Sequence, residues 1–413
     1  MALTMHDKKI ITKEIAKRYN RVKKKQKGKI LDELVALTGY NRSYASLVLR
    51  NWNRKLIIYQ NDGKPVVLTQ AKQHKQKRNK PRIYDDKVAA VLKQVWLICD
   101  CICGKRLAPY LAEIVPILIQ HKELIIDPIT KQKLLRISAA TIDRLLKKDK
   151  ARYRLKGKAP TKPGTLLLNQ IPIRTFADWN SKRPGFMEID LVGHDGGNGR
   201  GEYIQTLDMT DVYSSWTETQ AVKNKAQVWV FEALTDIRKR LPFELLGIDS
   251  DNGSEFINDQ LLRYCQEEKI SFTRSRPYRK NDSCFVEQKN YSIVRRAVGY
   301  HRYQTERELK LLNELYRSLR LYTNYFQPVM KLIEKRRIGS RVLRRYDRPK
   351  TPYQRLIEAV GLSEANKQRL RDEYAQLNPV ALKRDIEEVK RRLWNQTQKT
   401  YGKKRLEFKN NFV

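Results

Sequence analysis

The sequence predicts an α/β protein in which a mixed sheet flanked by helices follows all-α helix-turn-helix domains and precedes a basic, largely helical region. Apolar runs separated by turns, and then strand patterns alternating with helix patterns, predict the sheet within 185–299. Helical spacing of apolar residues predicts the helices on either side of it. The formal net charge of +40 indicates a polyanionic partner, with nucleic acid as the first candidate.

Changes in composition along the chain predict the bounds of its parts. Gly- and Pro-rich or purely basic stretches read as linkers between segments with apolar periodicity. We expect a helix-turn-helix domain at 1–70, a basic linker at 71–83, a second helical or helix-turn-helix-like domain at 84–155, a linker at 156–183, the α/β core at 184–330 and a basic C-terminal region at 331–413.

The first helix-turn-helix candidate lies around Gly39, which interrupts two helical patterns. Ala45, Val48 and Leu49 would face inward from the second helix, and a plain helical hairpin is the alternative. A weaker candidate follows Ser138, which would cap a helix, and there a simple packing domain is nearly as well supported. The residues expected to contact DNA from the first candidate and from the 71–83 linker are Arg42, Ser43, Tyr44, Ser46, Arg50, Lys75, Lys77 and Arg78.

Within the core, the pattern predicts the elements one after another. We expect strands at 185–194, 202–215, 216–222, 243–251 and 271–275, and helices at 226–242, at 254–270 with Ser254 as its cap, and at 285–299.

Charge is divided unevenly between this core and the rest of the chain. Residues 186–290 hold 13 Lys/Arg and 18 Asp/Glu, a net charge of −5, so the remainder carries +45. Carboxylates gathered on one domain suit a hard divalent cation, whereas basic flanks suit a nucleic-acid backbone.

Three acids stand out once the elements are placed. Asp190 lies on the first strand, Asp251 ends the fourth, and Glu287 opens the last helix. If the two strands are neighbours, the aspartates meet at one edge of the sheet and the helix adds Glu287. Three carboxylates gathered there would bind two Mg²⁺ ions and promote in-line attack on a phosphodiester.

Other acids compete for this role. Asp249 lies on the same strand face as Asp251 and is either the ligand itself or a supporting group. Glu188 shares the face of Asp190 and is a minor rival, while Asp208 and Asp211 read as strand-end and turn-capping residues.

Basic residues near Glu287 could hold DNA across the metal ions, although ordinary solvated charge is an equal alternative for each of them. Four lie on the loop before Glu287 and two on its helix: Arg274, Arg276, Arg279, Lys280, Lys289 and Arg295.

The motifs with Asp190, "SDNGSEF" (250–256) and Glu287 together resemble the catalytic core of DDE transposases and retroviral integrases. Thirty-five residues (252 to 286) separate Asp251 from Glu287, the spacing for which the D,D-35-E group is named. "YTNYFQPVMKL" (322–332) and "TPYQRL" (351–356) are similar to segments that follow the core in bacterial insertion-sequence transposases. The likeness spans about 184–356.

This resemblance implies a ribonuclease-H-like fold and an integrase-like catalytic core. It implies two Mg²⁺ or Mn²⁺ ions held by Asp190, Asp251 and Glu287, nicking by water at the ends of a mobile element, and transfer of the freed 3′-OH ends to target DNA. Expected partners are double-stranded DNA, both element ends and target, and further copies of the chain in a dimer or higher synaptic complex.

No membrane partner is expected, because no run of about 18 apolar residues is present. We expect a cytoplasmic, nucleoid-associated bacterial protein. Two other hypotheses remain open: a non-catalytic helix-turn-helix regulator, and a ribonuclease-H-like nuclease without strand transfer.

Overall fold

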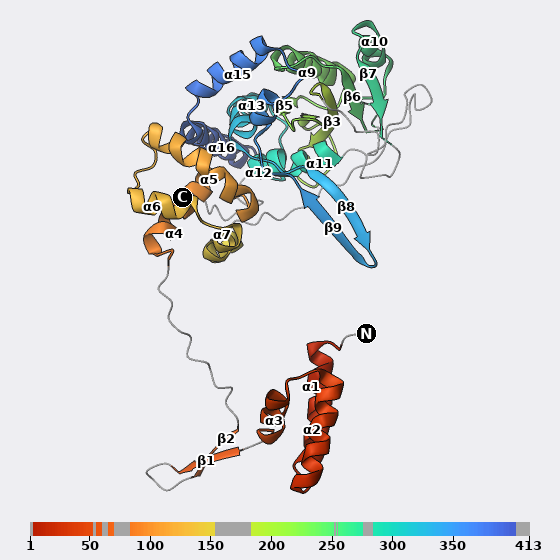
Figure 1. Cartoon of the computed structure of the whole chain (residues 1–413). Coiled ribbons are helices and arrows are strands. Elements are labelled where there is room, and N and C mark those ends of the chain that lie inside the picture. Colours follow the sequence, from red (N-terminus) through yellow and green to blue (C-terminus); the bar gives the residue numbers. More distant parts are fainter. Residues whose placement is uncertain are drawn as a thin grey trace. The chain divides into compact units, whose positions relative to one another are not determined.

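The computed structural model describes residues 3–52, 55–59, 65–69, 83–152, 183–251, 253, 255–275 and 284–401 (Figure 1). The chain divides into two compact units, residues 1–82 and residues 83–413. In the described part of the chain, no helix is both long enough and apolar enough to cross a bilayer.

The first unit contains three short helices: α1 (Met5–Tyr19), α2 (Lys24–Thr38) and α3 (Arg42–Arg50). Gly39 ends α2 with φ of 65°, which glycine adopts without strain, and the Asn41 side chain caps α3 by accepting from the Ser43 N–H at 2.9 Å. Leu34, Ala45 and Leu49 are fully buried between the helices. An antiparallel hairpin, β1 (Lys55–Tyr59) and β2 (Pro65–Thr69), follows them.

The second unit is built on a five-stranded sheet with strand order β5-β4-β3-β6-β7. Its strands are β3 (Phe186–Gly193), β4 (Gln205–Asp211), β5 (Thr217–Val222), β6 (Gly247–Ser250) and β7 (Ser271–Arg274). β3, β4 and β5 pair antiparallel, whereas β6 and β7 join β3 in parallel. Every residue of β4 is buried, so the middle of the sheet is covered on both faces. The predicted mixed α/β, ribonuclease-H-like core is confirmed.

Helices lie on both sides of this sheet. Those that follow the strands in the chain are α9 (Gln227–Arg240), α10 (Asp259–Glu267), α11 (Cys284–Lys289), the π-helix η2 (Asn290–Arg295), α12 (Arg296–Val298) and α13 (Glu306–Phe326). α9 and α13 pack against β5, and α11 packs against β3 and β4. Helix α10 begins later than the sequence suggests, and Asn258 caps it by accepting from the Leu261 N–H at 2.9 Å. Ser254, the predicted cap, lies outside the described residues.

The helices before the sheet belong to the same compact unit as the sheet. They are α4 (Asp86–Ile98), α5 (Gly104–Gln120), α6 (Pro128–Leu135), α7 (Ala139–Leu145) and α8 (Lys147–Arg152). Ser138 caps α7 as predicted, by accepting from the Thr141 N–H at 3.2 Å. Trp96 and Leu111 from these helices share one continuous apolar core with residues of the sheet and of the C-terminal helices.

The C-terminal part of the second unit begins with a hairpin, β8 (Leu332–Ile338) and β9 (Arg341–Tyr346). Three helices follow: α14 (Pro352–Ile357), α15 (Glu364–Gln376) and α16 (Pro379–Tyr401). The long helix α16 packs along α13, which ties the end of the described chain to the core.

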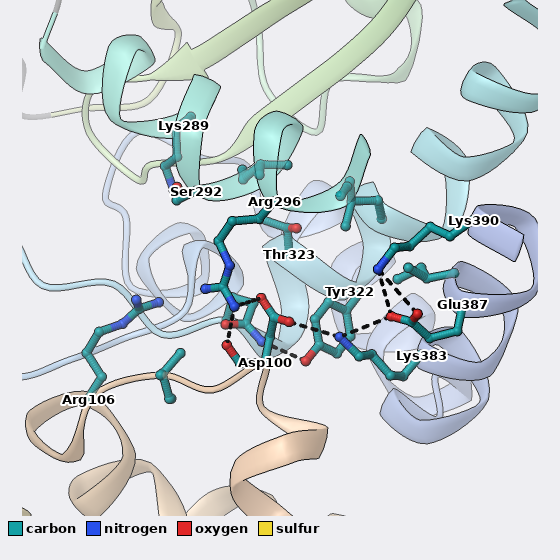
Figure 2. A pocket seen from close by; sticks show the side chains of 16 residues that line it. Asp100, Arg106, Lys289, Ser292, Arg296, Tyr322, Thr323, Lys383, Glu387 and Lys390 are labelled. Atoms are coloured by element: carbon teal, nitrogen blue, oxygen red, sulfur yellow. Dashed lines mark hydrogen bonds and ion pairs between the residues drawn. The ribbon is translucent and has the colours of Figure 1, made fainter. Parts of the chain in front are cut away.

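Asp100 joins three segments of this unit in a small charged network, here called the Asp100 clasp (Figure 2). It lies in the turn between α4 and α5. Its carboxylate accepts from Lys383 of α16 at 2.9 Å and lies 3.0 Å from Arg296 of α12, and Arg296 also donates to the Asp100 carbonyl. Burial alone would raise the pKa of Asp100, but Lys383 and Arg296 hold it at about 2. A cavity of about 80 Å³ beside the clasp is lined by further cations, including Arg106 and Lys289.

A second buried charge network lies at β5, an edge strand of the sheet. Glu218 of β5 is fully buried and accepts from the Trp216 indole at 2.8 Å, from Arg240 at 2.7 Å and from Arg320 at 2.6 Å. One carboxylate thus compensates two arginines, one on α9 and one on α13.

We expect Glu218→Gln to lower the free energy of unfolding by about 3 kcal/mol, because it removes the carboxylate that pairs with Arg240 and leaves Arg320 with the more distant Glu373 at 3.9 Å. Denaturant titration of the full chain measures this. Glu232→Gln on the exposed side of α9 is the matched control and should change stability by no more than about 0.5 kcal/mol. Equal effects of the two substitutions would contradict the role given to Glu218.

Candidate active site

The first two predicted acids lie at the same edge of the sheet. β3 and β6 are parallel neighbours whose last registered pair is Ile189 with Ser250, so Asp190 and Asp251 follow directly on adjacent strands. Both side chains are half-buried. Asp251 accepts from the Gly253 N–H at 2.8 Å, and this short turn after β6 holds its carboxylate at the strand end.

Ionisation of both Asp190 and Asp251 is electrostatically unfavourable when no cation lies between them. Burial, followed by the charge of Asp251, raises the pKa of Asp190 to about 7, and burial also raises the pKa of Asp251. Because the charged forms repel each other, a cation placed between the aspartates would favour their ionised state.

Further acidic side chains lie on the same face of the sheet, on the three strands β3, β4 and β6. Glu188 and Asp190 alternate onto the same face of β3, and the register places Asp249 beside Glu188 and Asp208 opposite Asp190. Burial is the main cause that raises the pKa of Glu188 and of Asp208 well above the ordinary values. One oxygen of Glu188 and one of Asp208 are buried without a hydrogen-bond partner among the described residues.

Helix α11 covers this acidic face and carries the third predicted acid, Glu287. The fully buried Glu188 fixes the start of the helix, since one of its oxygens accepts from the backbone N–H groups of Phe285 at 2.8 Å and Val286 at 2.9 Å. These are N–H groups of a helix's first turn, which have no partner within the helix itself. Glu188, weighed from the sequence as a rival ligand, therefore anchors the helix instead.

Glu287 itself is exposed. It follows directly on the two residues whose N–H groups bind Glu188, so it lies on the helix that packs against this face of the sheet. Its charge is a minor cause of the raised pKa of Asp190 and of Glu188, after burial. Among the described residues, however, no group of three or more His, Cys, Asp or Glu side chains comes together closely enough to hold a metal ion. The structure thus brings Asp190 and Asp251 together and does not complete the predicted three-carboxylate cluster.

The helix changes its winding directly after α11. Residues from Asn290 to Arg295 form a π-helix, a rare conformation that often occurs at functional sites. Asn290 begins it and donates its side-chain N–H to Asp190 at 2.6 Å. Asn290 could not be predicted from the sequence, because a single amide carries no periodic signal.

Three of the basic residues predicted beside the site are buried in the structure. Arg274, Lys289 and Arg295 are each less than 8% exposed, so none presents its charge on the surface. Arg295 donates to the carbonyl of Gly193 at 2.8 Å and stacks on Tyr300. Burial lowers the pKa of Lys289 to about 8, and Arg106 adds to this effect. In the structure without DNA these three side chains are buried, and their role as DNA contacts stays a prediction.

The remaining predicted contacts fall into two groups. Arg42, Ser43, Tyr44 and Arg50 are exposed on α3 and Ser46 is half-buried there, while Arg42 pairs with Asp32 of α2. The others lie outside the described residues: Lys75, Lys77, Arg78, Arg276, Arg279 and Lys280.

Comparison with known proteins agrees with this geometry. The family model of the integrase core domain matches residues 180–280, the stretch that contains β3 to β7. A curated relative, the uncharacterized protein y4rM of Sinorhizobium fredii (strain NBRC 101917 / NGR234), is 38% identical over 345 residues, which cover 84% of this chain and 93% of that protein. The chain belongs to the DDE transposase and integrase family. Its integrase-like core makes it an enzyme of the polynucleotidyl transferase type.

Two solved structures are similar to the core of this family member at low sequence identity. The catalytic core domain of BIV integrase is 16% identical and covers 42% of this chain and 94% of its own, with a TM-score of 0.29. The HTLV-2 integrase catalytic core domain, solved in complex with magnesium in a dimeric form, is 14% identical and covers 36% and 91%, with a TM-score of 0.27.

Proposed function

We propose that this protein is a DNA transposase of the bacterial insertion-sequence type, which nicks the ends of a mobile element and joins their 3′-OH groups to target DNA. The observation that supports this most directly is the placement of Asp190 and Asp251 on adjacent parallel strands, under a helix that carries Glu287. That arrangement occurs within a chain of the integrase-core family.

The donor set suits Mg²⁺ or Mn²⁺. Asp190 and Asp251 offer hard carboxylate oxygens, and the pKa of Asp190 is raised by burial and then by the like charge of Asp251. We propose that these two residues and Glu287 hold two divalent ions. When bound, the ions supply Lewis-acid stabilisation of the charge that develops on a phosphodiester under in-line attack.

The protein's own groups fix the geometry of this site. Asn290 holds one oxygen of Asp190, and the Gly253 N–H holds one oxygen of Asp251, so each carboxylate keeps a set direction. Glu188 holds the first turn of α11 against β3, so the helix that carries Glu287 is fixed beside the strand of Asp190. We propose that Glu287 closes onto them when cations and DNA neutralise the acidic face.

We further propose that the first unit recognises the element ends. Gly39 and Asn41 set the turn between α2 and α3, and α3 presents Arg42, Ser43 and Tyr44 on its exposed side. This helix-turn-helix arrangement suits insertion of α3 into a major groove. Because two ends must be joined to one target, we propose that the protein acts as a dimer or a larger synaptic assembly.

The test is a joining assay with the full chain and duplex oligonucleotides that carry the inverted repeats flanking its gene. With Mg²⁺ we expect nicked ends and then joined products, and with EDTA neither. Nicking without joining would identify a nuclease that lacks strand transfer. Sequence-specific binding with no nicking under any divalent cation would identify a non-catalytic regulator.

A further inference from the structure

The hairpin of β8 and β9, here called the ribbon, extends away from the sheet and the helices that surround it (Figure 1). Residues 339 and 340 make its tight turn, and Gly339 has φ of 58°, as a two-residue hairpin turn requires. All residues of β9 and all but Glu334 of β8 are exposed. Ile338 and Leu343 are exposed to 63% and 53%, so neither face of the ribbon is covered by the protein.

The ribbon carries far more cationic than anionic side chains. Its two strands carry six cationic side chains and one carboxylate, Glu334, which pairs with Arg336. The register divides the cations between both faces. One face carries Lys335, Arg337 and Arg344, and the other carries Arg336, Arg341 and Arg345.

Such a hairpin is poorly stabilised by its own contacts. Two-stranded hairpins without a covered apolar face are marginally stable in water. Lys335 and Arg344 are direct cross-strand partners, and like charges in that position repel each other. The charge pattern therefore indicates a partner that supplies negative charge along both faces.

The base of the ribbon is held firmly by the core. Lys331 donates to the carbonyls of Val212 at 2.7 Å and Tyr213 at 2.5 Å, at the turn between β4 and β5. On the other strand, Asp347 accepts from the Lys331 N–H at 2.7 Å and lies 2.7 Å from Arg355 of α14. A projecting cationic element is thus fixed in direction at the sheet that carries the candidate active site.

We propose that the ribbon binds duplex DNA by entering its major groove, with cations from both faces contacting the phosphates on the two walls. A two-stranded ribbon fits the width of this groove, and the phosphate rows on either side match the two cationic faces. The proposal rests on the proposed function only in taking DNA as the substrate, and it does not depend on cleavage.

The charges of the ribbon also argue against its pairing with a second ribbon, since that would bring twelve cations together. The acidic sheet face of another copy is a conceivable occupant of opposite charge, but α11 covers that face within each copy. Duplex DNA is therefore the occupant that the observations favour.

The test compares two variants of the full chain. The ribbon variant, Lys335→Gln/Arg337→Gln/Arg344→Gln, removes one cationic face. The control variant, Arg307→Gln/Lys310→Gln/Arg317→Gln, removes the same charge from exposed positions of α13. Affinity for an element-end duplex and for a random duplex is measured by fluorescence anisotropy at several salt concentrations, with EDTA present so that no cleavage occurs.

We expect the slope of log affinity against log salt to become shallower by about 2 to 3 units in the ribbon variant, since each lost phosphate contact removes about 0.9. The control variant should change the slope by less than about one unit. The ribbon variant should melt no lower than the wild type, because it loses the Lys335–Arg344 repulsion, and this separates lost contacts from lost folding.

Equal slope changes in the two variants would overturn the proposal. A ribbon variant with an unchanged slope but weaker self-association in sedimentation would also overturn it and identify a second copy as the occupant. Neither result bears on the transposase proposal, which is decided by nicking and joining in the presence of metal.

Discussion

Asp251→Asn is expected to reduce end nicking and joining by about 10³-fold or more, equivalent to roughly 4 kcal/mol of activation free energy. Asn keeps the shape of the side chain, and its carbonyl oxygen can still accept from the Gly253 N–H. The substitution removes the negative charge that a divalent cation requires. The measurement is the rate of the joining assay with Mg²⁺, alongside end binding in EDTA, which should be nearly unchanged.

Asp249→Asn is the matched comparison, because it lies two residues earlier on the same face of β6. Asp249 accepts from the Thr273 hydroxyl at 2.5 Å and lies beside Glu188. Its carboxylate is therefore engaged within the sheet and not at the strand end, where Asp251 lies. We expect this variant to keep activity within about tenfold of the wild type, or about 1.4 kcal/mol. An active Asp251→Asn enzyme with an inactive Asp249→Asn enzyme would reverse the assignment of the pair.

Glu188→Ala should also have a large effect, although Glu188 is proposed to act only through the position of α11. The substitution leaves the N–H groups of Phe285 and Val286 without their acceptor, at a cost of about 1–3 kcal/mol each when they stay buried. The helix start is then expected to detach and carry Glu287 away from Asp190. We expect joining to fall by about 10²- to 10³-fold.

Two further measurements separate positioning from direct catalysis. Glu188→Gln keeps an oxygen that accepts both N–H groups, so it should retain much more activity than Glu188→Ala. In an enzyme that already carries Glu287→Gln, adding Glu188→Ala should cost little more, because residues that act as a unit are not additive. Hydrogen exchange at the amides of 285 and 286 should accelerate in Glu188→Ala. Independent, additive losses would instead assign Glu188 a role apart from Glu287.

The sheet and two of its acids could be predicted from the sequence because they depend on local pattern. Apolar runs set the positions of β3 and β6, and the placement of Asp190 and Asp251 at adjacent strand ends follows once those strands are parallel neighbours. Short-range signals also predicted the turn at Gly39 and the cap at Ser138.

The supporting residues could not be predicted because their roles depend on tertiary contacts. Glu188 and Asn290 are recognisable only once α11 lies across β3. Arg295 was predicted to lie on the helix of Glu287, but neither the π-helix from Asn290 nor the hydrogen bond of Arg295 to the Gly193 carbonyl could be predicted from local pattern. The ribbon was missed because its apolar residues show no strict alternation that would distinguish a strand from an extended basic segment.

The Asp100 clasp has a practical consequence for anyone who divides this protein into pieces. Residues 180–280, which match the family model, exclude Asp100, Arg296 and Lys383 together with the apolar partners on α5, α13 and α16. A fragment cut to those limits would expose to water the apolar surface that these helices cover in the full chain. The sheet belongs to the compact unit 83–413, so we expect a stable fragment to need the helices that precede the sheet as well as those that follow it.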